Sequence, residues 1–128
     1  MHAFIVSNYE PTSIKVREVL LHQGLDCPAS NMLSLELAER KLAGTRADVV
    51  VIVLSPEVEQ GLSVLRHLRG TVHGRLVVIG PASEPKLIMQ TLRDGADQYL
   101  DESDPAGELA AVLTRLRAET GAESEQPG

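Results

Sequence analysis

The fold of this chain is decided by the stretch Ala47-Asp48-Val49-Val50-Val51-Ile52-Val53-Leu54-Ser55-Pro56. Its centre, residues 49–54, is a continuous apolar run in which almost every side chain is β-branched. A strand with one wet face alternates between polar and apolar residues, whereas a strand covered on both faces does not. The run therefore predicts a central strand of a parallel sheet, buried between two layers of helices.

Strand and helix patterns alternate along the rest of the chain. Further short apolar runs predict strands at residues 3–7, 25–29, 76–79 and 98–100. Because Pro28 has no N–H to donate, the strand at 25–29 is expected at an edge of the sheet. Helix starts are expected at Pro11, Ser30 or Asn31, Ser55-Pro56, Ser83 and Asp104-Pro105, and helix ends at Gly24 and Gly44. This alternation predicts an α/β fold with helices on both faces of a parallel sheet.

Composition favours one domain in a reducing compartment. The chain has 128 residues, a formal net charge of −6 and a single cysteine, Cys27, so no disulfide can form within it. Its apolar runs are too short to span a bilayer, and we expect a cytoplasmic protein without membrane contact. The only aromatic residues are Phe4, Tyr9 and Tyr99, and the arginines are scattered. Both features argue against direct nucleic-acid binding.

The apolar pattern ends before the chain does. Leu109, Val112, Leu113 and Leu116 form the last stripe at helical spacing, and the acidic residues that follow have no hydrophobic period. We expect a domain at residues 1–118 and a flexible acidic tail or linker at residues 119–128. An effector domain is expected to follow that linker in the full-length protein.

Three segments resemble the receiver domains of bacterial response regulators. They are residues 47–56, Gly61-Leu62-Ser63-Val64-Leu65-Arg66-His67-Leu68-Arg69 and Leu92-Arg93-Asp94-Gly95-Ala96-Asp97-Gln98-Tyr99-Leu100. The resemblance extends over residues 3–117 and implies a flavodoxin-like (βα)5 three-layer sandwich with the parallel strand order 2-1-3-4-5. The segment Val77-Val78-Ile79-Gly80 also resembles the atypical receiver domains of MinD-like pilus-assembly localisation ATPases.

The residues that carry out phosphoryl transfer in receivers are replaced in this chain. In that family an aspartate lies eight residues before the glycine that opens the Gly-Leu-x-Val-Leu-Arg segment, and Val53 occupies that position here. Ser7 and Asn8 stand where receivers keep an acidic pair for magnesium. Gly80 stands at the position of a hydroxyl residue, and Glu102 at the position of a lysine. The resemblance therefore marks a degenerate site.

These replacements remove each requirement of aspartyl phosphorylation. The reaction needs a carboxylate nucleophile, a divalent cation and a positive side chain at the transferred oxygens. Val53 has no oxygen, neutral Ser7 and Asn8 are poor ligands for magnesium, and Glu102 carries the wrong charge. The four histidines lack ligand-like spacing, and no Gly-x-Gly-x-x-Gly motif occurs. We expect no catalytic residue, no metal and no cofactor.

The expected function is that of a non-catalytic signalling domain, a pseudo-receiver that binds a protein partner or a second copy of itself without aspartyl phosphorylation. Two alternatives stay open: a small-molecule site in the same crevice, and phosphorylation at an unconventional residue such as Ser55. An apolar plug of Val53 and Leu54 would favour the binding module. Polar groups converging around Ser7, Asn8, Glu57 and Glu102 would favour the ligand site.

The interaction face is expected on the fourth helix, the fifth strand and the fifth helix. The resemblance marks Tyr99 as an aromatic switch residue that changes rotamer with activation in receivers. Mixed charge surrounds it, contributed by Arg93, Asp94, Asp97 and Arg115. Such a composition suits a specific interface of modest affinity, and a homodimer is the expected assembly.

Overall fold

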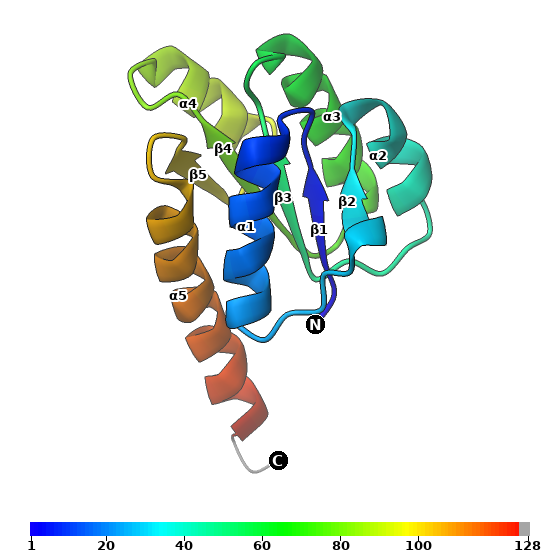
Figure 1. Ribbon diagram of the computed structural model, residues 1–128, viewed down its shortest axis with the longest axis vertical. Helices are drawn as coiled ribbons and strands as arrows, with labels where there is room; N and C mark the ends of the chain where they lie inside the picture. Colours follow the sequence, from blue (N-terminus) through cyan, green and yellow to red (C-terminus); the bar gives the residue numbers. More distant parts are fainter. Residues whose placement is uncertain (126–128) are drawn as a thin grey trace.

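Five parallel strands lie between two layers of helices in the computed structural model (Figure 1). It describes residues 1–125, with the side chains of residue 117 and residues 119–125 left out. The elements are β1 (Ala3–Val6), α1 (Glu10–His22), the 3-10 turn η1 (Ala29–Asn31), β2 (Met32–Leu33), α2 (Leu35–Leu42), β3 (Val49–Val53), α3 (Val58–Thr71), β4 (Arg75–Gly80), α4 (Pro85–Arg93), β5 (Gln98–Asp101) and α5 (Pro105–Glu125). The strand order β2-β1-β3-β4-β5 confirms the predicted flavodoxin-like α/β fold.

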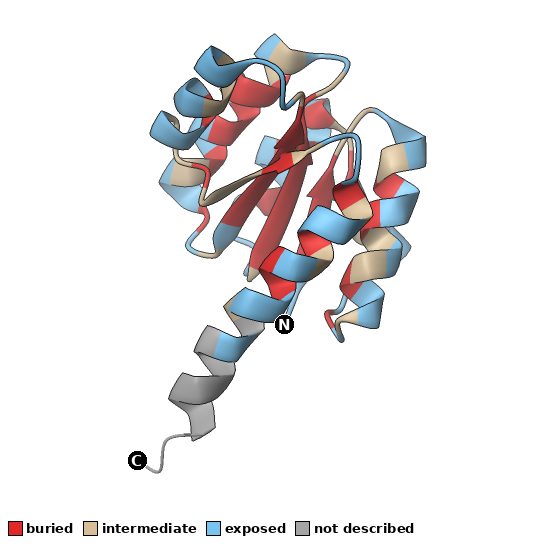
Figure 2. Ribbon diagram, turned by 90° about the vertical axis from the view of Figure 1, so that its left-hand side faces the viewer, coloured by how far each residue is buried: buried red, intermediate tan, exposed pale blue. Residues whose placement is uncertain are grey.

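The apolar run at the centre of the sheet supplies both halves of the core. Val49, Val51 and Val53 pack on the side of α1 and α5, and the residues between them pack on the side of α2 and α3. Every residue of β3 is buried, and Figure 2 shows the buried strands enclosed by helices with exposed outer faces. A continuous apolar strand is stable here because both of its faces leave water.

The second strand forms later in the chain than predicted. β2 is Met32–Leu33, paired with Ile5 and Val6, whereas the predicted segment 25–29 contributes only an isolated bridge between His2 and Asp26. Pro28 cannot join a ladder, and the chain turns through η1 before it pairs. The second helix shifts with it and begins at Leu35 after Ser34, instead of after Ser30 or Asn31.

The third helix also begins later than its sequence signal. Ser55-Pro56 was expected to cap and open it, but this peptide bond is cis and α3 begins at Val58. The Ser55 hydroxyl is used elsewhere, because it donates a hydrogen bond to Glu102. The fourth helix begins at Pro85 with Glu84 at the cap position, one residue beyond the expected cap Ser83. The start at Asp104-Pro105 is confirmed, since Asp104 Oδ1 accepts a hydrogen bond of 3.2 Å from the Gly107 N–H.

The fifth helix continues to Glu125, where a flexible acidic segment was expected from residue 119. Alanine, glutamate and arginine are good helix formers, and the single Gly121 costs only about 1 kcal/mol in a helix. Residues 126–128, the rest of the expected linker, lie outside the described part of the chain. Among the described residues, no helix is both long and apolar enough to cross a membrane.

A glycine lets α3 approach the end of β3. A Cβ atom built on Gly61 would lie 2.7 Å from Leu54 Cδ2 and 3.3 Å from Leu54 Cα. Any larger side chain would push the helix away from the strand. The close approach fixes the loop of residues 54–57 above the carboxyl edge of the sheet.

Candidate functional site

The predicted site positions gather at the carboxyl edge of the sheet. β1, β3, β4 and β5 all end there, and in open α/β sheets this edge is where ligands bind (Figure 1). Ser7 and Asn8 follow β1, Val53 and Gly80 end β3 and β4, and Glu102 follows β5. The fold therefore brings the five predicted positions to one edge.

The end of β3 is apolar on both faces. Val53 is 2% exposed and packs in the core cluster beneath α1 and α5. Leu54 is fully buried and packs in the cluster on the opposite face. The strand end therefore offers neither a nucleophile nor a hydrogen-bonding side chain.

Asn8 is occupied by contacts within the fold. Its Oδ1 accepts a hydrogen bond of 2.9 Å from the Leu35 N–H, at the first turn of α2. Its Nδ2 donates to Glu57 Oε2 over 3.2 Å. Asn8 thus joins the end of β1 to α2 and to the loop after β3, which is a structural role.

Ser7 closes a local turn. Its Oγ accepts a hydrogen bond of 2.9 Å from the Tyr9 N–H, so the hydroxyl shapes the β1–α1 loop. No group of three or more histidine, cysteine, aspartate or glutamate side chains able to hold a metal occurs in the described part of the chain.

Glu102 joins the loop after β5 to the loop after β3. The Ser55 hydroxyl donates to Glu102 Oε1 over 2.6 Å, a short distance typical of a hydrogen bond to a carboxylate. The polar groups named for the crevice thus form two separate pairs, Ser55 with Glu102 and Asn8 with Glu57. The loop after β3 contributes one member to each pair.

A cavity of about 410 Å³ opens above Val53. Its lining comes from the start of α1, the loop after β3 and the loop after β5, and consists of Tyr9, Thr12, Val53, Ser55, Pro56, Glu102 and Ser103. The floor is apolar, and the single charged residue of the lining is Glu102. This composition differs from that of an anion site, which needs positive charge.

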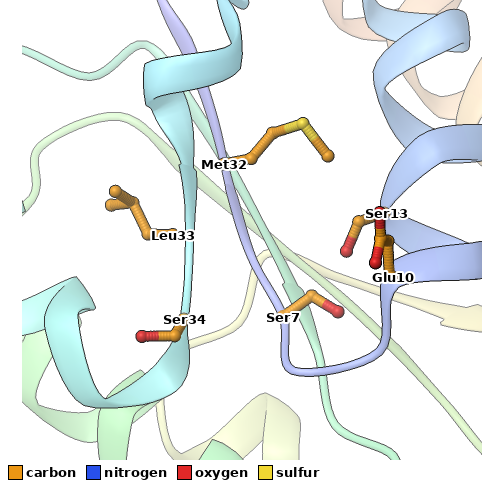
Figure 3. Close-up of a pocket in the computed structure, with 6 residues that line it drawn as sticks. All are labelled: Ser7, Glu10, Ser13, Met32, Leu33 and Ser34. Atoms are coloured by element: carbon orange, nitrogen blue, oxygen red, sulfur yellow. The ribbon is translucent and has the colours of Figure 1, made fainter.

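A smaller hollow of about 210 Å³ lies beside it, between β1, β2 and α1. Figure 3 shows Ser7, Ser13 and Glu10 near the start of α1, with the Ser34 and Leu33 side chains directed away from them. The Ser7 hydroxyl contacts the Tyr9 carbonyl over 3.2 Å, whereas Ser34 is directed elsewhere. Ser13 Oγ donates to the same Tyr9 carbonyl over 3.1 Å, so both hydroxyls are used at the start of α1.

Tyr99 is held inward at the end of the sheet because Gly80 has no side chain. The ring packs against the core cluster on the α3 side, and its hydroxyl donates to the Pro81 carbonyl over 2.8 Å. A Cβ built on Gly80 would collide with that hydroxyl. Burial, with a smaller contribution from Glu102 and other nearby carboxylates, raises the pKa of Tyr99 to about 12.

The residues predicted for the interaction face do not all point outward. Asp94 pairs with Arg66 of α3 over 3.0 Å, and Asp97 pairs with Arg69 of α3 over 3.3 Å. Asp97 also accepts a hydrogen bond of 2.8 Å from the Leu76 N–H. Both aspartates therefore hold the turn between α4 and β5 against its neighbours. Arg93 and Arg115 are exposed, as an interaction face requires.

The sequence prediction missed the apolar surface of α4. Met89 is 54% exposed and Leu92 44% exposed, and Ile88 beside them is partly exposed. Thr91 is the one fully buried residue of this helix. Apolar residues at helical spacing predict a buried face, and only the positions of the neighbouring elements reveal that this face points into solvent.

Comparison with known proteins identifies the fold. No family model and no curated protein matches the sequence. The structure is similar to the signal receiver domain of a histidine kinase from Syntrophus aciditrophicus, with a TM-score of 0.74 at 21% identity over 99% of this chain and 94% of that one. A response regulator from Thermotoga maritima gives a TM-score of 0.70 at 20% identity over 91% and 94%.

A third similar structure holds a metal. The receiver domain of a sensor histidine kinase from Pseudomonas aeruginosa PAO1 gives a TM-score of 0.69 at 16% identity, over 89% of this chain and 94% of that one. It is described with a magnesium ion coordinated in its active-site cleft. The chain therefore has the fold of response-regulator receiver domains.

Proposed function

We propose that this domain is a pseudo-receiver, a signalling module that acts by binding a protein surface and does not use aspartyl phosphorylation. The observation that carries the proposal is Val53, buried at the end of β3 where a phosphate-accepting domain of this fold needs a carboxylate. A two-component signalling role is supported by the receiver fold. The other receiver-site positions at this edge, Ser7, Asn8, Gly80 and Glu102, also lack the side chains that aspartyl phosphorylation requires.

The charge at this edge opposes phosphate at any acceptor. Ser55 is the hydroxyl residue that closely follows β3, but its O–H donates a hydrogen bond to Glu102. Phosphorylation there would place a charge of about −2 beside that carboxylate. No lysine or arginine lines the cavity to compensate it. The second alternative, an unconventional phosphate acceptor, is therefore disfavoured electrostatically.

Gly80 leaves room for one fixed orientation of the Tyr99 ring. In receivers, which this chain resembles, the aromatic residue at this position moves between inward and outward rotamers with activation. Here the ring is inward without any phosphoryl group, in the space that a side chain at residue 80 would fill. We infer that the surface around β5 keeps one form and does not switch with phosphorylation.

The binding surface we propose is the exposed side of α4, and its occupant is a second copy of the chain. Ile88, Met89 and Leu92 are separated by one, three and four positions, so they form one face of the helix. Exposed apolar side chains grouped in this way mark contact surfaces. Lys86 and Arg93 flank the face, with Glu84 before it, so a two-fold contact can set positive groups against negative ones.

Met89→Glu combined with Leu92→Glu should convert a dimer into a monomer, because charge on both partners of a two-fold contact repels. Sedimentation velocity measures the change. The matched control is Ile14→Glu with Leu21→Glu, which adds the same charge at residues of α1 that are 48% and 45% exposed. The control should stay dimeric. Acetyl phosphate with magnesium should leave the dimer fraction of the wild type unchanged.

Two results would contradict the assignment to α4: a monomeric wild type, or a dimer that survives the Met89 and Leu92 changes. Tyr99→Ala is a poor substitute for this test. The partly buried ring packs against the core and its hydroxyl donates to the Pro81 carbonyl, so its removal would lower stability as well as alter the surface.

A further inference from the structure

We propose that the cavity above Val53 binds an organic cation, an ammonium group carried on a short apolar body. The site is distinct from the α4 surface and goes beyond the protein-binding role. It would use the crevice in which receivers handle an anion, with the sign of the preferred charge reversed.

The size and walls of the cavity suit a small ligand. Its volume of about 410 Å³ lies within the range of small-molecule sites, roughly 300–1,000 Å³. Val53 forms a floor that cannot hydrogen-bond, and Pro56 adds a second apolar surface from the loop after β3. The part of a ligand that enters most deeply must therefore be apolar.

The rim selects a positive charge. Glu102 is the one charged side chain of the lining, and the Ser55 hydroxyl fixes its Oε1. Its Oε2 accepts no side-chain hydrogen bond within the described residues, so that oxygen is available to an incoming donor. Because Glu102 is exposed, an ammonium group can meet it while staying hydrated. The apolar body can then enter the cavity.

An aromatic side chain at the rim favours the same ligand. Tyr9 is 49% exposed and lines the cavity from the start of α1. The face of a phenol ring attracts ammonium and guanidinium groups, by about 0.5–1 kcal/mol at exposed sites. Thr12, Ser55 and Ser103 add hydroxyl groups that can accept N–H donors.

Other ligand classes fit the same lining poorly. A phosphate or carboxylate would meet Glu102 and find no basic residue in the lining. A bare divalent cation would find one carboxylate and three hydroxyls, far from the oxygen-rich shell that calcium or magnesium takes in proteins. A neutral apolar molecule would make no favourable electrostatic interaction with Glu102.

The test is a titration of the ¹⁵N-labelled domain with three compounds that share one apolar body: benzylammonium, benzyl alcohol and benzoate. We expect saturable amide shifts at Thr12, Ser55, Glu102 and Ser103 with benzylammonium. Benzyl alcohol should bind at least tenfold more weakly, and benzoate should not bind. Equal binding of the three compounds, or shifts confined to other parts of the domain, would overturn the proposal.

Two variants separate the charge of Glu102 from general effects. Glu102→Gln keeps an acceptor for Ser55 but removes the charge, and should weaken benzylammonium binding at least tenfold. Glu36→Gln, an equivalent change at an exposed residue of α2, should leave it unaltered. Unchanged binding by Glu102→Gln would refute the site.

A further titration with Nα-acetyl-lysine amide identifies the source of the cation. Binding weaker than that of benzylammonium would indicate a free small molecule as the natural ligand. Tighter binding would indicate a lysine side chain of a partner protein. Both results require the same site, and failure of all the cations would exclude it without affecting the dimer test on α4.

Discussion

Val53→Asp should lower the free energy of unfolding by about 3 kcal/mol or more and should still leave the domain unphosphorylated. The new carboxylate would lie in the core cluster beneath α1 and α5, at a position that is 2% exposed. An unpaired charge there is costly, and no basic residue lines the adjoining cavity. Restoring the receiver-like residue alone would therefore damage the fold without restoring the chemistry.

The stability lost in Val53→Asp should depend on pH in a definite direction. Burial raises the folded-state pKa of the introduced aspartate above its unfolded value of about 3.9. The variant therefore loses stability as the pH rises through that interval, and urea denaturation should show a smaller deficit at pH 4 than at pH 7. Val53→Asn, similar in shape but uncharged, is the matched control and should lack this dependence. A Val53→Asp protein as stable as the wild type would contradict the buried placement of residue 53.

Gly80→Ala should release Tyr99 from its inward position and cost about 1–3 kcal/mol of stability, as overpacked cores do. The added Cβ would collide with the tyrosine hydroxyl and lie 3.1 Å from Leu54 Cδ1. Once the ring moves into water, its pKa should fall from about 12 towards the ordinary value of about 10. A pH titration that follows the Tyr99 ring signals by NMR measures this without interference from Tyr9.

The same pKa predicts how Tyr99 affects stability in alkali. Its folded-state pKa is raised, so its contribution is complete below about pH 10 and is lost as the pH rises towards about 12. Gly80→Ala should remove this alkaline loss. Gly70→Ala is the control, because nothing lies within 4 Å of a Cβ at that position. An unchanged Tyr99 pKa in Gly80→Ala would show that the glycine does not hold the ring inward.

The sheet was predictable from sequence where its strands are buried on both faces. Residues 49–54 carry a pattern that only a covered parallel strand explains, and the neighbouring strands follow from the alternation of elements. The edge strand was misplaced because β2 has only two residues and a proline lies before it. Its position depends on pairing with Ile5 and Val6, which no local pattern records.

Predictions from sequence were wrong where a polar side chain has a partner that is distant in the chain. Ser55 has the sequence features of a cap, but its hydroxyl bonds to Glu102, 47 residues away. Asp94 and Asp97 likewise appear as free surface charges in the sequence, yet both pair with arginines of α3. Sequence spacing cannot show which charges meet across the fold.

The sequence predicted at which edge of the sheet the site residues lie, but not which residues they contact. Ser7, Asn8, Val53, Gly80 and Glu102 all reach the carboxyl edge, as their places after or at the ends of strands imply. The cavity above Val53 and the inward Tyr99 depend on packing between loops that are far apart in sequence. No local sequence pattern records such packing.

Intact-mass measurement after incubation with acetyl phosphate and magnesium tests the pseudo-receiver proposal most directly. We predict that the wild-type mass stays unchanged, because Val53 offers no nucleophile and Glu102 repels a phosphoryl group at the neighbouring hydroxyl. Ser55→Ala and Glu57→Gln are included to locate any unconventional acceptor. A gain of one phosphoryl group by the wild type that is lost in either variant would contradict the proposal and establish a phosphorylated receiver instead.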